Sequence, residues 1–252
     1  MAAMLSGIVI TKNEQQVIRD CIISLRFCDE IIVVDTGNTD ETNKIARELG
    51  ARIVKSSGSD YSKFRNDGSA AAKGEWILYL DADERVTPLL KIEVEKTIKN
   101  ETVFSAFEIP RKNIYLAHEM HYGGWGNDAV IRLFKKAKLL MYVNPLHEQP
   151  RVDGPIGKLE NYMVHFSHRG LYSMLNKTFG FTAYEADLRY KSEHPPVVVW
   201  RLVRVMLTEF WKRMIKQKAF LDGPEGIIDA MFQMFNSFVI YVRLWERQNK
   251  IP

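Results

Sequence analysis

The 252-residue sequence contains only two cysteines, Cys21 and Cys28, and no histidine lies near either of them. These thiols therefore do not make a zinc site, and a reduced, intracellular protein is the default expectation. The glycine fingerprints Gly-x-Gly-x-x-Gly and Gly-x-x-x-x-Gly-Lys are also missing. Their absence argues against a dinucleotide-binding enzyme and against a P-loop NTPase.

Long uncharged runs are missing too. No such run reaches the length of a transmembrane helix, and charged residues interrupt the N-terminal apolar segment too early for a signal peptide. The chain is 46% hydrophobic and 26% charged, which is the composition of an ordinary globular protein. Its length favours one large domain with an appendage.

The segment 76–84, Trp-Ile-Leu-Tyr-Leu-Asp-Ala-Asp-Glu, carries the clearest functional signal. Its five apolar residues predict a strand buried on both faces of a parallel sheet. Asp81 and Asp83 follow at the carboxyl end of that strand, where open α/β sheets bind their ligands. Two carboxylates so close repel each other unless a cation lies between them. Their oxygens suit Mg²⁺ or Mn²⁺, with a substrate diphosphate completing the coordination. Taken alone, the segment could also be an acidic turn.

The first 100 residues alternate between apolar runs and amphipathic segments. We expect strands at 5–11, 30–35, 51–54 and 76–80, and helices at 15–25, 41–49, 64–73 and 87–98. This alternation predicts an α/β fold with a doubly wound, mostly parallel sheet and right-handed crossovers.

The pattern changes after residue 100. Strands are expected at 103–109, 129–134, 139–143 and 160–166, without long helices between them and with a glycine-rich loop at 123–128. A mixed sheet edge or a small antiparallel subsheet explains this part most simply.

The C-terminal third is helical, with helices expected at 173–190, 197–220 and 225–247. The second of these helices carries six basic residues and one acid, interleaved with Trp, Phe, Met and aliphatic residues. Such a helix could pack on the rest of the protein. The same composition also suits a helix at an anionic lipid surface. The uncharged segment 230–242 is too short to span a bilayer.

Polar side chains follow several of the predicted strands on one edge of the sheet. Asp35, Asp81 and Asp83 stand at or just after strand ends, and Thr11 and Glu14 leave the first strand at the same edge. Each acid alone could be a helix cap or a solvated loop residue. Their joint placement indicates a nucleotide site made of side chains and a metal rather than of a glycine loop.

Several blocks of the sequence resemble family 2 glycosyltransferases of the GT-A fold. They are Ile-Thr-Lys-Asn-Glu at 10–14, Val-Val-Asp-Thr-Gly-Asn-Thr-Asp at 33–40, Arg-Asn at 65–66 with Gly-Glu-Trp at 74–76, and Leu-Asp-Ala-Asp-Glu at 80–84. More narrowly, the chain resembles the lipopolysaccharide-core β-glucosyltransferase branch at five places. These are Gly-Gly at 123–124, Asp128, Arg-Leu-Phe at 132–134, His-Glu at 147–148 and Phe-Leu-Asp-Gly at 220–223. The likeness covers nearly the whole chain. Asn38 stands where such sequences often have serine.

The resemblance implies a role for each matching residue of the donor site. Asp35 would contact the base or ribose of a nucleotide sugar, with Thr11, Glu14 and Arg65 in the same site. For the metal, it implies that Asp83 binds the ion directly and that Asp81 lies near the ribose and the metal. His147 would be a third contact, although a structural role is equally open for it. Histidines 118, 121, 165, 168 and 194 are expected to be structural.

The family is inverting, so one displacement at the anomeric carbon is expected, with a base to take the proton of the acceptor hydroxyl. Asp128 is the expected base because it follows the Gly-Gly loop, as the family's catalytic acid does, and Glu148 is the second candidate. Asp128 could otherwise be a loop acid that caps a strand.

The resemblance implies a metal-dependent hexosyltransferase that uses Mg²⁺ or Mn²⁺ and a nucleotide sugar, with UDP-glucose the expected donor. Its acceptor would be a glycan or a lipid-linked glycan of the cell envelope, and no nucleic-acid partner is expected. The expected domains are a catalytic domain at 1–170, with a donor half at 1–100 and an acceptor half at 101–170, and a helical tail at 171–252. The expected location is cytoplasmic, peripheral on the inner face of the plasma membrane.

Three other functions remain open at this point. A polyprenyl-phosphate sugar synthase would share the sheet, although the Gly-Gly and His-Glu region favours a glycan acceptor. A nucleotidyltransferase would need a glycine-rich phosphate loop near the first strand, which is absent. A non-enzymatic membrane-binding module would not need the strand-end acids.

Overall fold

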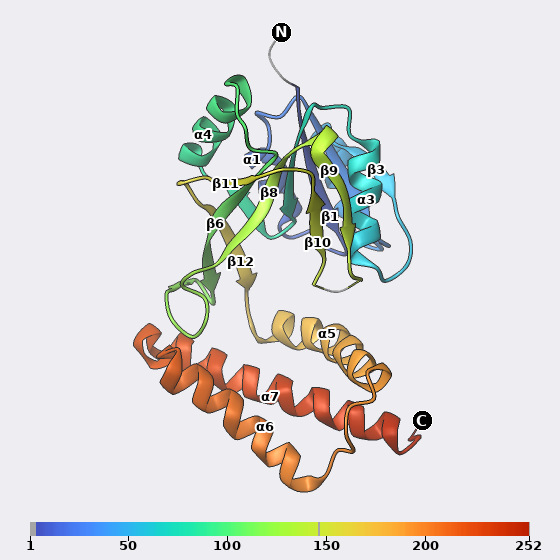
Figure 1. Cartoon of the computed structure of the whole chain (residues 1–252), viewed down its shortest axis with the longest axis vertical. Coiled ribbons are helices and arrows are strands. Elements are labelled where there is room, and N and C mark those ends of the chain that lie inside the picture. Colours follow the sequence, from blue (N-terminus) through green and yellow to red (C-terminus); the bar gives the residue numbers. More distant parts are fainter. Residues whose placement is uncertain (1–3, 146, 252) are drawn as a thin grey trace. The chain divides into compact units, whose positions relative to one another are not determined.

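The computed structural model describes residues 4–145 and 147–251, and the chain forms two compact units. The first unit comprises Met1–Lys112 and Asp128–His165, and the second comprises Asn113–Asn127 and Phe166–Pro252 (Figure 1). Residues 113–127 belong to the same unit as the C-terminal helices.

The predicted doubly wound, mostly parallel sheet with an antiparallel part is confirmed. Its strand order is β3-β2-β1-β4-β8-β6-β12-β5, and the first four strands in this order are parallel. These are β3 (Arg52–Lys55), β2 (Glu30–Asp35), β1 (Leu5–Thr11) and β4 (Trp76–Asp81). The later strands are β5 (Glu84–Val86), β6 (Ala106–Tyr115), β7 (His118–Met120), β8 (Ala129–Lys135), β11 (Ile156–Lys158) and β12 (Met163–His168). A separate antiparallel pair joins β9 (Leu139–Val143) to β10 (Gln149–Val152).

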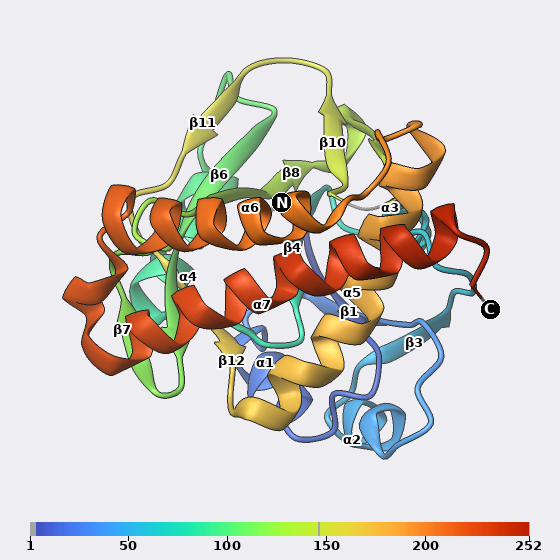
Figure 2. The ribbon, with the colours of Figure 1, turned by 90° about the horizontal axis from the view of Figure 1, so that it is seen from below.

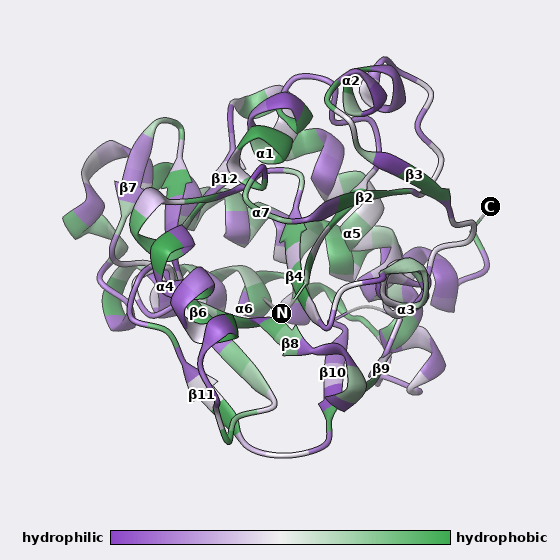
Figure 3. Ribbon diagram, turned by 90° about the horizontal axis from the view of Figure 1, so that it is seen from above, coloured by the Kyte–Doolittle hydropathy of each residue, from purple (hydrophilic) through white to green (hydrophobic). Residues whose placement is uncertain are grey.

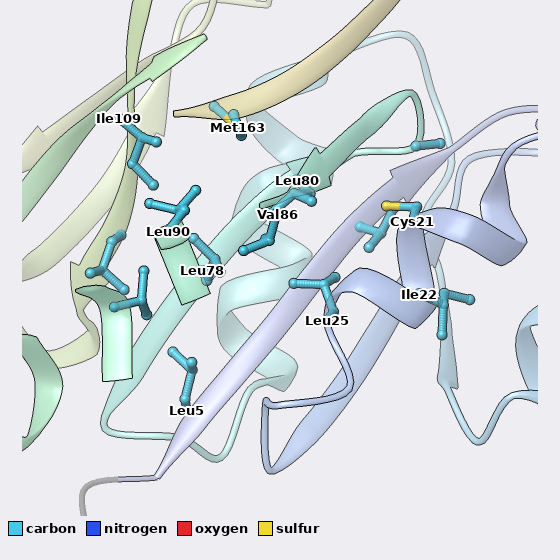
Figure 4. Close-up of a cluster of buried hydrophobic side chains, with 14 of the residues drawn as sticks. Leu5, Cys21, Ile22, Leu25, Leu78, Leu80, Val86, Leu90, Ile109 and Met163 are labelled. Atoms are coloured by element: carbon cyan, nitrogen blue, oxygen red, sulfur yellow. The ribbon is translucent and has the colours of Figure 1, made fainter. Parts of the chain in front are cut away.

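Successive residues of the central strands face two different hydrophobic cores. Val9 belongs to the core that contains residues of α1 (Ile18–Ser24) and α4 (Pro88–Lys99), shown in Figure 4. Ile8 belongs to the core that contains Phe64 of α3 (Tyr61–Ala71). Both faces of the strands are therefore buried, and β2 accordingly appears hydrophobic over most of its length in Figure 3. This is why the strands read as continuous apolar runs.

Local sequence signals set the helices of the first unit. The side chain of Asp60 accepts hydrogen bonds from two backbone N–H groups and caps α3, and Thr87 caps α4 with Pro88 in its first turn. Gly68 lets α3 approach β1 closely, because a Cβ there would lie 2.8 Å from Cγ2 of Ile8. α2 (Thr42–Glu48) follows β2 as expected.

Several predicted elements differ from the observed ones. The strand expected at 103–109 is Ala106–Tyr115, and the short strands β5, β7, β10 and β11 were not anticipated. The single helix expected at 197–220 is instead α6 (Val199–Trp211), a π-helical turn η2 (Lys212–Lys216) and a 3-10 turn η3 (Ala219–Asp222). The break lies at Lys218, whose φ of 56° is left-handed and cannot continue a helix.

The second unit packs helices against one another and holds the glycine-rich loop. α7 (Gly223–Gln248) packs against both α5 (Leu171–Lys191) and α6, and α6 runs beside α7 in Figures 1 and 2. The side chain of Asp222 accepts hydrogen bonds from the backbone N–H groups of His121 and Tyr122. Asp229 accepts one from Nε1 of Trp125 at 2.9 Å. The loop is thus fixed by acids at the start of the last helix.

Among the residues that the structure describes, one helix, Ala219–Gln248, is long and apolar enough to cross a membrane by length and composition alone. Core helices of soluble proteins can meet the same criterion. This helix contains Asp229, which is fully buried in the structure.

Candidate active site

The predicted edge of strand-end side chains exists in the structure. In the parallel register Thr11 lies opposite Asp35, and Ile10 lies opposite Asp81. Thr11, Asp35 and Asp81 therefore stand at the carboxyl ends of three neighbouring strands, β1, β2 and β4. An open α/β sheet binds its ligands at this edge.

Asp35 is held in a tight turn after β2. Its carboxylate accepts hydrogen bonds from the backbone N–H groups of Gly37 and Asn38 and from the side chain of Asn43. Burial raises the pKa of Asp35, but these donors outweigh burial, so the pKa lies below its usual value. Thr11 accepts a hydrogen bond from the Asn38 amide, and the backbone N–H of Glu14 bonds the hydroxyl of Thr42. An ionised Asp35 therefore sits in a preorganised turn, as a donor-binding acid requires.

Two buried arginines hold the carboxylate of Asp81. Nη2 of Arg65 lies 2.9 Å from Oδ1, and Nη2 of Arg132 lies 2.5 Å from Oδ2. Burial raises the pKa of Asp81, but the guanidinium groups of Arg132 and Arg65 outweigh it and hold that pKa well below its usual range. Asp81 therefore stays ionised, and much of the repulsion that we expected a cation to relieve is relieved by arginine.

Arg65 also reaches the second candidate base. Its Nε donates to Oε1 of Glu148 at 2.9 Å, while the guanidinium lies over the rings of Tyr79 and Tyr142. Burial raises the pKa of Tyr142 to about 12, so its hydroxyl stays protonated at neutral pH. Arg65 thus joins Asp81 to Glu148 from a buried position on α3.

Glu84 lies at the centre of the remaining charged contacts. Its Oε1 accepts hydrogen bonds from Arg111 at 3.0 Å and from Arg132 at 3.3 Å, and its Oε2 accepts one from the backbone N–H of Asp81 at 2.9 Å. Its side chain is completely buried. Unlike Asp81, whose side chain is 34% exposed, this acid therefore faces no solvent.

Arg111 extends this network to Asp128, the expected base. Its Nε and Nη2 donate to the two carboxylate oxygens of Asp128 at 2.8 and 2.9 Å. Burial lowers the pKa of Arg111, but Asp128 and Glu84 outweigh it and raise that pKa above its usual value. Acids and arginines therefore alternate from Glu148 through Arg65, Asp81, Arg132, Glu84 and Arg111 to Asp128.

A histidine that we expected to be structural lies beside the second strand-end acid. Nε2 of His165 on β12 is 3.7 Å from Oδ1 of the buried Asp83, and His165 also acts electrostatically on Asp81. Carboxylate oxygen and imidazole nitrogen are both metal ligands, so this pair fits a divalent cation whose other ligands come from a diphosphate. His147, the expected third contact, is exposed and has a left-handed φ of 55°. In the described part of the chain no group of three or more His, Cys, Asp or Glu residues is arranged to hold a metal.

The structure therefore brings together Asp81, Arg65 and Glu148 directly, and joins Asp128 to them through other residues. Sequence reasoning missed the roles of Glu84, Arg111, Arg132 and His165. Glu84 and Arg132 lie inside blocks that carry the family resemblance, which is a signal that could have marked them. Arg111 and His165 sit in ordinary strand sequence, and only the fold places them at the site.

Comparison with known families identifies the class of protein. Residues 6–154 match the family described as glycosyl transferase family 2, which is more than half of the chain. The chain therefore belongs to glycosyl transferase family 2 and is a glycosyltransferase. This result excludes the non-enzymatic alternative.

The relatives extend over the helical unit as well. The chain is 26% identical over 255 residues to an uncharacterised glycosyltransferase of Rickettsia typhi, covering 96% of this chain and 87% of that one. It is 20% identical over 250 residues to the lipopolysaccharide core biosynthesis glycosyltransferase LpsC of Rhizobium meliloti, covering 96% and 92%. Among solved structures, glucosyl-3-phosphoglycerate synthase of Mycobacterium tuberculosis in complex with Mn²⁺, UDP and glucosyl-3-phosphoglycerate is 22% identical, with a TM-score of 0.39 over 44% of each chain.

Proposed function

We propose that this glycosyltransferase is an inverting, metal-dependent enzyme that transfers glucose from UDP-glucose to a lipid-linked glycan of the cell envelope. The observation that carries the proposal is the alternating network that joins Asp81 at the donor edge to Asp128. A displacement at an anomeric carbon needs a donor-binding edge and a base held at a fixed place beside it. The likeness to the lipopolysaccharide core glycosyltransferase over nearly the whole chain supports the acceptor class.

In this proposal Asp35 and Thr11 contact the nucleoside, and Asp128 takes the proton of the acceptor hydroxyl. Arg111 holds the carboxylate of Asp128, the group that accepts this proton, through two hydrogen bonds. Glu148 is the second candidate for this step. The hydroxyl oxygen attacks the anomeric carbon as the bond to the diphosphate breaks, so the configuration inverts in one displacement.

Asp83 and His165 would hold Mg²⁺ or Mn²⁺, with Asp81 beside them. When bound, the cation supplies positive charge for the diphosphate leaving group.

The proposal is tested with a panel of nucleotide sugars, each incubated with the full-length enzyme and Mg²⁺ or Mn²⁺, and the released nucleotide is identified. Release of UDP from UDP-glucose, and not from the UDP-hexose controls, is the expected result. Release of a different nucleotide would overturn the proposed donor, and transfer to a polyprenyl phosphate rather than to a glycan would overturn the proposed acceptor.

The second unit supports a peripheral location on an anionic membrane, on the cytoplasmic side where nucleotide sugars are made. One row of α6 and η2 exposes apolar side chains at four-residue spacing: Val199, Val203, Leu207, Trp211 and Ile215. The neighbouring row exposes Trp200, Arg204, Thr208, Lys212 and Lys216. An apolar row flanked by cations matches an anionic lipid surface, where the apolar side chains insert and the cations meet headgroups.

Arg213 is not part of that lipid-facing row. It binds Glu209 at 2.9 Å and donates to the backbone carbonyl of Gly123 at 2.8 Å. It also lies 3.5 Å from the buried Asp229. This residue therefore holds the glycine-rich loop, and the exposed cations Arg204, Lys212 and Lys216 are the ones that we assign to the membrane.

A further inference from the structure

We infer that Glu84 is a positioning residue which, through Arg111 and Arg132, holds the carboxylates of Asp128 and Asp81 in one fixed arrangement. The inference rests on the proposed function, in which Asp128 is the base and Asp81 belongs to the donor site. Glu84 would position Asp81 and Asp128 without contacting either substrate.

The geometry of Glu84 supports this role. Oε1 receives one arginine that pairs with Asp128 and a second arginine that pairs with Asp81. Oε2 receives the backbone N–H of Asp81 itself. One carboxylate thus fixes the backbone of the donor acid and both guanidinium groups.

Burial makes the arrangement rigid. The side chain of Glu84 is 0% exposed, and those of Arg132 and Arg111 are 7% and 17% exposed, whereas Asp81 and Asp128 are 34% and 22% exposed. The supporting residues are therefore less accessible than the two acids that they hold. A buried network of paired charges has few alternative arrangements, because a rearrangement would leave a buried charge without its partner.

A charged carboxylate is required for this task. The glutamine of Glu84→Gln has nearly the same shape, but its single carbonyl oxygen cannot replace both Oε1 and Oε2 as acceptors. Its NH₂ group would also point a donor at a guanidinium or at the N–H of Asp81. The variant therefore keeps the volume of the side chain but loses the contacts that hold Arg111, Arg132 and the backbone of Asp81 together.

The test compares kinetic constants for UDP-glucose hydrolysis with Mn²⁺ in four full-length variants. Arg111→Lys should lower kcat and leave KM for UDP-glucose nearly unchanged, because Arg111 pairs with Asp128 and Glu84 but not with Asp81. Arg132→Lys should raise KM, because it disturbs Asp81. Glu84→Gln should do both, with kcat lower by about 10- to 100-fold, as misplacement of reacting groups typically costs.

Glu30→Gln is the matched control. Glu30 also accepts hydrogen bonds from an arginine, a hydroxyl and a backbone N–H, namely Arg52, Ser6 and Lys73, but it stands at the opposite end of β2 from Asp35. Loss of stability alone should lower the melting temperature of both glutamine variants and change the kinetic constants of neither. Unchanged kcat and KM in a folded Glu84→Gln protein would overturn the inference.

Crystal structures of wild type and Glu84→Gln give a second readout, which does not depend on the identity of the donor. If the glutamine variant does not fold, the structure of Arg111→Lys is determined instead. Arg111 or Asp128 should leave its wild-type position in Glu84→Gln. Unchanged Arg111–Asp128 and Arg132–Asp81 pairs would overturn the inference even if the enzyme proves to use a different donor. A wild-type enzyme that does not hydrolyse UDP-glucose would instead count against the proposed donor alone.

Discussion

Two arginines, one in each unit of this protein, are used in opposite ways. In the first unit Arg132 is buried and touches two carboxylates, Asp81 and Glu84. In the second unit Arg204 is exposed and lies over the ring of Trp200, with its guanidinium carbon 4.9 Å from the ring centre. The first arrangement depends on each individual partner, whereas the second depends on the sum of several similar cations. Loss of Arg132 should therefore be severe, and loss of Arg204 should be mild.

The most severe change should be removal of the cation or of its proposed ligand. We expect Asp83→Ala to abolish nucleotide release with the fold intact, and excess EDTA to do the same to the wild-type enzyme. Activity and the melting temperature are measured together, so that unfolding is distinguished from loss of the site. Full turnover in excess EDTA would show that the enzyme does not need a divalent cation.

Asp128→Asn should lower the transfer rate by about 10²-fold or more while leaving UDP binding nearly unchanged, as loss of a general base does. Rates are measured at saturating donor, and UDP affinity is measured by calorimetry. Glu148→Gln is assayed beside it. Near-native turnover by the Asp128 variant, with a slow Glu148 variant, would transfer the role of base to Glu148.

One substitution made in both units tests the comparison directly. Arg132→Gln should lower the free energy of unfolding by about 2–3 kcal/mol, less than for a fully buried pair because Asp81 is 34% exposed at its side chain. Arg204→Gln should change it by no more than about 0.5 kcal/mol. Urea denaturation of the two variants measures both values. Equal values would contradict the distinction between the two kinds of arginine.

The smallest effects per residue should be those on membrane binding. Replacing Arg204, Lys212 and Lys216 together by glutamine should weaken binding to anionic vesicles about tenfold at physiological salt, since each cation contributes less than about 1 kcal/mol when screened. Hydrolysis of the soluble donor should not change. Co-sedimentation with neutral and anionic vesicles measures the effect, and equal binding of wild type to both would count against a membrane role for α6.

The apolar row gives the matched control for that measurement. Trp211→Ala should weaken vesicle binding equally at low and high salt, because insertion of an aromatic ring does not depend on screening. The cation variant should differ from wild type mainly at low salt.

Much of the fold could be predicted from the sequence because its signals are local. The buried strands at 30–35 and 76–81 are continuous apolar runs, and the edge that carries Thr11, Asp35 and Asp81 follows from parallel strands alone. The short strands β5, β7, β10 and β11 have three or four residues each and carry too few side chains to show a period.

The candidate site was only partly predictable, because its supporting contacts join residues far apart in the chain. Arg65 meets Glu148 across 83 residues, and Arg132 meets Asp81 across 51. No local pattern encodes such pairs. The acidic segment at 81–84 was visible, but its sequence does not tell that Glu84 points into the protein while Asp81 is partly exposed.

The hydrogen bonds between the glycine-rich loop and the acids at the start of the last helix have a consequence for synthesis of the chain. Tyr122 and Trp125 find their partners Asp222 and Asp229 at sequence separations of 100 and 104 residues. At the usual rate of translation the loop leaves the ribosome roughly 5–20 s before those acids exist. During that time the segment before Asp128 has no native partner from the last helix, although the strands on either side can already pair. The nascent protein should therefore form its parallel strands first and fix the glycine-rich loop only after the last helix has been synthesised.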